Sequence, residues 1–186
     1  MKFTEGFWLR SERVTASYAA QAFRVERIDH GMRILTPERP ILSRADALDQ
    51  TVLSVEFTSF SKNDIRVAAR HFEAYDIRPA HFEMTGSPDD VKIEENDSEV
   101  LMTAGDVTVR VVKSNFHYTF EAGGKVLTGS GSRNLGYMRL DRKPSTMRPG
   151  DNYLTADYKP YMVAELSVKP GEYVYGFGEQ FTSFTK

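Results

Sequence analysis

The sequence predicts an all-β domain, an antiparallel two-sheet β-sandwich with little helix. Two observations support this prediction. Apolar and polar residues alternate with a period of two along many short segments, as in strands that bury one face. Turn-forming residues, mainly Gly, Pro and Asp, separate these segments. With 186 residues the chain is long enough for one domain with its own core.

In the first half of the chain, the alternation is clearest at 53–58. Leu53, Val55 and Phe57 should point to one side of this strand and its polar residues to the other. Only residues 43–49 have a helical pattern, and they amount to a turn or two. The other strands predicted here lie at 22–28, 33–35, 65–70, 81–84 and 91–94.

In the second half, a strand at 107–112 should pair with 100–102 across a turn at 104–106. A strand at 116–120 leads into a hairpin in which Gly123 and Gly124 supply positive φ, and the chain returns through 126–127. A further strand is predicted at 161–168. The turn at Pro170 and Gly171 should then start an aromatic strand through 173–175.

Residues 128–160 do not show the alternation of apolar and polar residues, and we predict a long loop within the domain. The segment is rich in Gly, Ser, Arg, Asp and Pro, with a short apolar interlude at 135–140. A loop of this length in a compact domain is uncommon and is usually functional or disordered. We therefore expect it to contribute to a neighbouring site.

Both ends of the chain carry family-specific segments. Residues 171–182, Gly-Glu-Tyr-Val-Tyr-Gly-Phe-Gly-Glu-Gln-Phe-Thr, resemble the YGLGERFT-type segment that closes the N-terminal domain of glycoside hydrolase family 31. Gln180 stands where that family often has Arg. Residues 1–8, 14–18 and 20–23 resemble the start of its bacterial α-xylosidase branch.

The resemblance implies a galactose-mutarotase-like sandwich over residues 1–186, cut before a catalytic β/α barrel. Members of the family place the aspartate nucleophile and the aspartate acid/base in that barrel. No alternating strand-helix pattern is present here to form one. We therefore expect no catalytic residue in this chain. Its partners would be its own downstream barrel, an α-linked oligosaccharide bound by the full-length enzyme, and further copies in a homo-oligomer.

Composition excludes several other classes of partner. The formal charge is −2, from 24 basic and 26 acidic residues, which does not favour nucleic acid or an anionic membrane. The chain has no cysteine, which excludes disulfides and Cys-ligated zinc. The first residues are charged and contain no apolar run of signal-peptide length. We expect a cytoplasmic protein.

No cofactor or metal site is predicted. Residues 176–181 begin like a dinucleotide fingerprint but lack its third glycine, and 129–132 lack the Gly-Lys of a phosphate loop. The acidic stretch at 89–99 does not have calcium-loop spacing. Histidines 30, 71, 81 and 117 show no metal-ligand spacing and are expected to be ordinary strand or edge residues.

Without catalytic residues, this chain could still have a supporting role at the rim of the substrate pocket. The family's N-terminal sandwich often lends a loop to that rim. Carboxylates accept hydrogen bonds from sugar hydroxyls, and an aromatic face can stack on a sugar ring. In the loop at 128–160, the candidate substrate contacts are Asp141, Asp151, Tyr153 and Asp157.

Two other functions stay open at this point. The chain could be a self-standing carbohydrate-binding sandwich whose exposed aromatic residues hold a glycan. It could also be a small-molecule-binding barrel with an apolar cavity, although the loop at 128–160 breaks the even strand rhythm of such a barrel. The substrate itself, an α-xyloside or an α-glucoside, is decided by residues outside this sequence.

Overall fold

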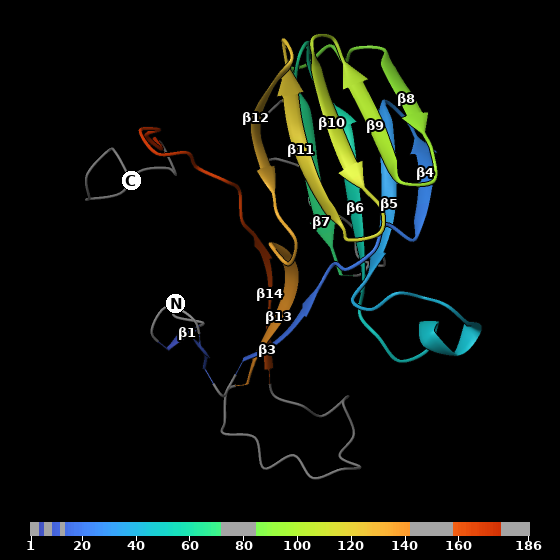
Figure 1. The fold of residues 1–186 in the computed structure, drawn as a ribbon, viewed down its shortest axis with the longest axis vertical. Coiled ribbons are helices and arrows are strands. Elements are labelled where there is room, and N and C mark those ends of the chain that lie inside the picture. The colour runs from blue at the N-terminus through green and yellow to red at the C-terminus, as the bar shows by residue number, and fades with distance from the viewer. Residues whose placement is uncertain (1–3, 6–8, 12–13, 72–84, 142–157, 176–186) are drawn as a thin grey trace.

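The computed structural model describes residues 4–5, 9–11, 14–71, 85–141 and 158–175. Strands dominate these residues, and all of their ladders are antiparallel. Two sheets lie face to face as a sandwich, and a third sheet lies below them in Figure 1. The structure confirms the predicted fold class.

The first layer of the sandwich is a four-stranded sheet in the order β4-β5-β6-β7. Consecutive strands are neighbours. Short turns connect β4 to β5 and β6 to β7, while the longer segment at 38–51 connects β5 to β6. The turn between the first two strands contains His30 at φ 51°, a conformation that few residues other than glycine adopt. The strands are β4 (Arg24–Ile28), β5 (Gly31–Pro37), β6 (Val52–Ser59) and β7 (Ile65–Arg70).

The second layer is a five-stranded sheet in the order β12-β11-β10-β9-β8, again with sequence neighbours paired. A β-bulge follows Phe120, because Phe120 pairs with Thr128 and Glu121 pairs with Val126, which leaves Leu127 without a partner. The strands are β8 (Val91–Glu95), β9 (Glu99–Ala104), β10 (Val107–Val112), β11 (His117–Ala122) and β12 (Lys125–Ser130).

The core lies between these two layers and follows directly from the alternation in the sequence. Phe57 of β6 is fully buried and meets Tyr118 of β11 edge to face, with ring centres 5.2 Å apart. Such aromatic pairs add to the stability that area burial provides. The inward residues of the other central strands join this cluster: Met32, Ile34, Leu53, Val55, Val100, Met102, Val109 and Val111.

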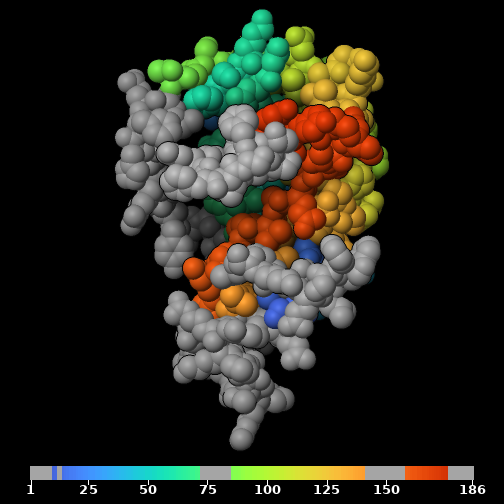
Figure 2. Space-filling view, turned by 90° about the vertical axis from the view of Figure 1, so that its left-hand side faces the viewer, coloured from blue at the N-terminus to red at the C-terminus, as the bar shows by residue number. Residues whose placement is uncertain are grey.

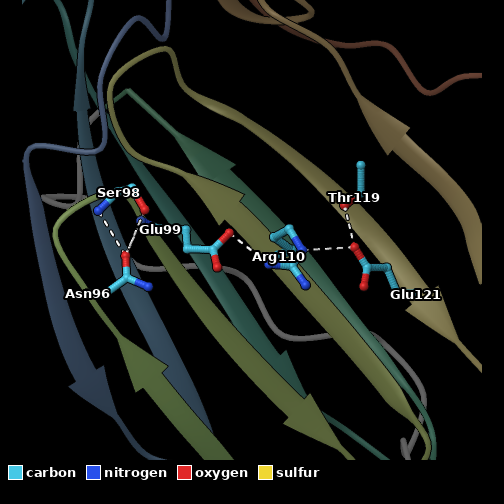
Figure 3. Close-up of polar contacts among 6 residues, drawn as sticks. All are labelled: Asn96, Ser98, Glu99, Arg110, Thr119 and Glu121. Carbon is cyan, nitrogen blue, oxygen red and sulfur yellow. Dashed lines mark hydrogen bonds and ion pairs between the residues drawn. The ribbon is translucent and has the colours of Figure 1, made fainter. Parts of the chain in front are cut away.

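The outer face of the five-stranded sheet is polar and holds a chain of ion pairs (Figure 3). Arg110 of β10 contacts Glu99 of β9 at 2.7 Å and Glu121 of β11 at 2.9 Å. These contacts raise the pKa of Arg110 and lower that of Glu121. At the start of β9, Asn96 Oδ1 accepts hydrogen bonds from the backbone N–H groups of Ser98 and Glu99.

A polar clamp connects the turns at one end of the sandwich. Asn63, in the turn between β6 and β7, accepts a hydrogen bond from the backbone N–H of Asp106 at 2.7 Å. The backbone N–H of Asn63 donates to Asp89 Oδ2 at 2.9 Å. Gly105 sits against this clamp at φ +57°, and a Cβ there would lie 2.1 Å from Asn63 Oδ1. The turn therefore needs glycine for both reasons.

The third sheet has the order β14-β13-β3, and β1 (Thr4–Glu5) pairs separately with β2 (Leu9–Arg10). Its strands are β3 (Val14–Tyr18), β13 (Leu135–Asp141) and β14 (Tyr158–Ala164). Gly136 of β13 lets Tyr18 of β3 pack closely, because a Cβ at 136 would lie 2.8 Å from the tyrosine ring. Leu135 and Tyr137 join the core cluster of the sandwich.

The prediction of a long loop at 128–160 is wrong at 135–141, where the chain forms strand β13. This strand is the central one of its sheet and pairs with β3 and β14. Leu135, Gly136, Tyr137 and Met138 are all buried, so both faces of the strand are covered. A strand buried on both faces shows no alternation. The ends of the segment are also strands, because β12 extends to Ser130 and β14 begins at Tyr158.

The prediction for 161–175 also needs correction. The strand ends at Ala164 instead of 168. The next residues lie along β12, where Ser167 N–H donates to Gly129 O at 2.8 Å and Lys169 Nζ donates to Val126 O at 2.7 Å. The predicted turn at Pro170 and Gly171 is confirmed, with Gly171 at φ +87°. The aromatic strand after it is reduced to a single bridge residue at Tyr175.

Most of the other predicted elements are confirmed. The brief helical turn is the 3-10 helix η1 (Arg44–Ala47). The two glycine hairpins exist, with Gly105, Gly123 and Gly124 at positive φ. The predicted strand at 81–84 falls outside the described residues. Strand β3 was not predicted.

Replacing Phe57 by alanine is expected to lower the free energy of unfolding by about 3–5 kcal/mol, because it leaves a cavity between the sheets. Urea denaturation followed by circular dichroism measures this change. Leu42→Ala is the control, since Leu42 is 89% exposed and its loss should change stability by less than about 0.5 kcal/mol. Equal effects of the two substitutions would contradict the assignment of the core.

Candidate functional site

The four predicted substrate contacts are only partly within the described structure. Asp141 is the last residue of β13, and its Cα is paired with that of Tyr158 at the start of β14. Asp151, Tyr153 and Asp157 lie outside the described residues. The structure therefore brings none of them together with another, and their role stays a prediction.

A groove opens next to this end of β13. Its volume is about 870 Å³, and it is open to solvent along one side. It lies between one face of the three-stranded sheet, the segment at 38–51, and the turns that carry Asn115 and Ser132. We call it the β13 groove. Its polar and aromatic lining includes Thr15, Ser17, Tyr18, Glu38, Arg39, Asp49, Gln50, Thr51, His71, Asn115, Ser132, Arg133, Tyr137, Arg139 and Tyr158.

The floor of the β13 groove is set by strand register. Tyr137 pairs with Ser17 and Arg139 pairs with Thr15, so these four residues belong to one face of the sheet. Tyr137 and Arg139 of β13 are therefore presented to the groove. Tyr137 also belongs to the core cluster, which fixes the strand beneath it.

His71 lies flat on the ring of Tyr137, with ring centres 4.0 Å apart and planes inclined by 14°. Burial lowers the pKa of His71, and the positive charge of Arg139 lowers it further. The ring is therefore neutral near pH 7 and adds no positive charge to the groove. His71 directly follows β7, so it lies at the end of a strand.

Tyr137 is held in its phenol form. Burial raises its pKa to about 12, and a hydrogen bond with the side chain of Tyr158 contributes. A phenol with so high a pKa can donate or accept a hydrogen bond but does not act as a base near neutral pH. The centre of the groove is thus a hydrogen-bonding surface.

Two arginines pack against tyrosine rings at the groove. The guanidinium carbon of Arg133 lies 5.1 Å from the ring centre of Tyr18, and that of Arg139 lies 5.7 Å from the ring centre of Tyr158. These are cation–π distances. Arg133 sits in the tight turn before β13 at φ 65°, so its backbone is also fixed.

The opposite wall is the segment between β5 and β6. Arg39 donates to the backbone oxygen of Asp49, and its backbone N–H donates to Gln50 Oε1 at 2.9 Å. Gln50 in turn donates to the backbone oxygen of Asp46. Thr51 bridges to the floor, because its hydroxyl donates to Ser17 Oγ at 3.0 Å. The wall is therefore tied together and attached to β3.

The chemistry of this groove is that of binding. Its phenol, guanidinium, amide and hydroxyl groups suit a polar ligand. Among the residues that the structure describes, no group of three or more His, Asp or Glu side chains could hold a metal ion. Within the same residues, no helix is long and apolar enough to cross a membrane.

Comparison with protein families gives one match. Residues 46–186 match the family described as the glycosyl hydrolase 31 N-terminal galactose mutarotase-like domain. This range covers three quarters of the chain and includes the whole sandwich except β4, β5 and the strands before them.

Two curated relatives align with the whole chain. The α-xylosidase XylQ of Lactiplantibacillus pentosus is 29% identical over 188 residues, which is 23% of its own length. An α-xylosidase of Emericella nidulans is 28% identical over 196 residues, which is 25% of its length. The chain thus spans about a quarter of the length of the relatives it matches.

Solved structures support the fold. A cycloalternan-forming enzyme from Listeria monocytogenes, solved with a pentasaccharide substrate, matches with a TM-score of 0.51 and 12% identity. The match covers 73% of this chain and 11% of that one. An uncharacterized protein from Listeria monocytogenes EGD-e matches with the same values.

The pKa of His71 offers a direct test of the groove's electrostatics. NMR titration should give a value below 6.5, so stability should decline as the pH falls below 6.5, where the unfolded chain binds the proton more readily. Arg139→Gln should raise this pKa but leave it below 6.5, because burial is the larger cause.

Arg66→Gln serves as the control, since Arg66 is exposed on β7 and does not line the groove. It should leave the titration of His71 unchanged. A pKa of 6.5 or higher in the unsubstituted protein would show that the ring is not buried against Tyr137.

Proposed function

Because the chain belongs to the glycosyl hydrolase 31 N-terminal galactose mutarotase-like domain family, we propose that it is the non-catalytic N-terminal domain of a retaining α-xylosidase. It packs on a catalytic β/α barrel of the same polypeptide. The names of the two curated relatives favour an α-xyloside over an α-glucoside as the substrate of the full-length enzyme. A cytoplasmic location remains part of this proposal.

One observation carries the proposal of a docked barrel. Large apolar side chains are exposed along residues 162–175, next to the two exposed apolar residues of β12. Leu166 is 54% exposed, Val168 55% and Tyr173 71%. Exposed apolar side chains that lie close together mark interaction sites in soluble proteins. We call this surface the apolar strip, and it consists of Val126, Leu127, Met162, Leu166, Val168, Tyr173 and Tyr175.

Figure 2 shows the face of the molecule that carries the strip. Residues 158–175, in orange-red and red, run along this face and reach β12 in yellow-orange. The backbone N–H and the hydroxyl of Ser167 both donate to Gly129 O, at 2.8 Å and 2.9 Å, and hold the two segments together. The apolar strip is therefore a fixed surface, and a partner would not have to order it on binding.

The size of the strip suits a domain interface. Full burial of one aliphatic or aromatic side chain contributes roughly 1.5–3 kcal/mol. Since the strip residues are about half exposed, each would add about half as much on docking. The curated relatives are about four times as long as the part aligned with this chain, so such enzymes contain further domains to cover it.

The chemical step is assigned to the barrel. Retaining hydrolysis needs two carboxyl groups about 5–5.5 Å apart, one of them a nucleophile. We place both aspartates in the barrel. This domain would shape the rim of the substrate pocket, with Asp141, Asp151, Tyr153 and Asp157 as the candidate contacts. Arg139 and Tyr158, which precede and follow these candidates in the sequence, both line the β13 groove.

The 186-residue chain alone is expected not to hydrolyse an aryl α-xyloside, because both catalytic carboxylates lie elsewhere in the full-length enzyme. Release of the aryl group by the purified chain, followed by absorbance, measures this. The full-length enzyme is the positive control. Turnover by the chain alone at a rate similar to that of the full-length enzyme would refute the placement of the aspartates.

Docking through the apolar strip is tested by Leu166→Asp together with Val168→Asp in the full-length enzyme. Both side chains are half exposed here, so the isolated chain should keep its stability within about 0.5 kcal/mol per site. In the full-length enzyme the substitutions should lower the melting temperature and expose the domain boundary to protease. Leu42→Asp is the matched control, and equal behaviour of the two variants would contradict the docking surface.

A further inference from the structure

The β13 groove contains more positive than negative charge. Among the described residues that line it, Arg39, Arg133 and Arg139 supply three positive charges, and Glu38 and Asp49 supply two negative ones. The whole protein has a net charge of −2. The excess at the groove is therefore a local feature and does not follow from composition.

Two of these arginines have no carboxylate partner among the side chains that the structure describes. Arg39 lies 3.8 Å from Glu38 and also donates to a backbone oxygen, so its charge is engaged. Arg133 packs on the ring of Tyr18, and Arg139 packs on the ring of Tyr158. By contrast, Arg110 on the outer sheet face binds two carboxylates.

The tyrosines leave these guanidinium groups able to bind a ligand. A ring stacked on a guanidinium covers a face of the cation, while the N–H groups point outward in its plane. That edge presents the paired donors that fit a carboxylate or a phosphate. Tyr18 is additionally held by Arg10, whose guanidinium carbon lies 4.9 Å from its ring centre. The ring on which Arg133 packs is therefore itself held in place.

The rest of the lining suits sugar hydroxyl groups. Ser132 donates to Asn115 Oδ1 at 3.0 Å, which leaves the amide N–H₂ of Asn115 directed elsewhere. The phenol of Tyr137 and the amide of Gln50 add further donors and acceptors. A volume of about 870 Å³ is in the range of sites that hold a small ligand such as a short saccharide.

We propose that the β13 groove binds an anionic saccharide, a sugar that carries a carboxylate or a phosphate, through Arg133 and Arg139. The hydroxyl groups of the sugar are bound by the tyrosine, asparagine and glutamine side chains of the groove. This site lies within the present chain and does not depend on the proposed hydrolase activity. If the groove binds no anionic saccharide, the proposed hydrolase activity still stands. If the hydrolase activity is not found, the proposed saccharide site still stands.

Isothermal titration of the 186-residue protein at low salt tests the proposal with four probes: glucuronic acid, glucose 1-phosphate, xylose and inorganic phosphate. At least one of the charged sugars should bind at least about tenfold more tightly than xylose, since a charge-assisted bond is lost with the neutral sugar. Binding should weaken as salt is added. Which of the two charged sugars binds distinguishes a uronic acid from a sugar phosphate.

Arg133→Gln and Arg139→Gln should each weaken binding of the charged sugar about tenfold, and Arg139→Lys should restore part of the loss because it keeps the charge. Arg66→Gln is the matched control, because it removes an arginine outside the groove. Circular dichroism and melting temperature confirm that each variant is folded.

Several results would overturn the proposal. Equal affinity for xylose and the charged sugars would show that charge plays no part. Inorganic phosphate that binds as tightly as glucose 1-phosphate would show that the sugar plays no part. Unchanged binding in both glutamine variants would place the ligand elsewhere, and this result can be read even if one variant is destabilised.

Discussion

The apolar layer between the four-stranded and five-stranded sheets is the constraint on which the rest of the structure depends. Phe57 and Tyr118 meet at its centre, and every central strand contributes inward side chains to it. Leu135 and Tyr137 of β13 belong to the same layer. The third sheet is thereby anchored to the sandwich core, and the groove on its face inherits a rigid floor. A change in the core would therefore reach the groove through Tyr137.

The sequence predicted the strands correctly where one face of the strand is turned toward the core and the other toward solvent. In β10, and in β6 apart from the buried Ser54, buried and partly buried residues alternate, so period-two counting found both strands and the inward side of each. The same counting failed at β13, where Leu135 to Met138 are all buried. Glycine at 136 also argued for a loop, yet it is there because Tyr18 packs against it. Local pattern contains no information about cover from another sheet.

The groove was beyond prediction for a different reason. Its lining comes from segments at 15–20, 38–51, 132–139 and 158, together with His71 and Asn115. None of these segments has a motif with functional spacing, and strand register alone places Thr15 beside Arg139. The candidates predicted from the sequence were acidic and aromatic residues from Asp141, the last residue of β13, onward, since carboxylates accept hydrogen bonds from sugar hydroxyls. Arg133 and Arg139 became informative only once the structure showed that no described carboxylate pairs with them.

The residues after β14 also affect how this protein behaves in concentrated solution. β12 is the last strand of its sheet, and a strand at an edge offers free backbone groups to other chains. Ser167 and Lys169 occupy the carbonyl groups of Gly129 and Val126 along that edge. Intermolecular strand addition, the first step of β-aggregation, must therefore displace residues 165–169 before it can begin at β12. Residues 165–169 therefore hinder aggregation through the edge of β12.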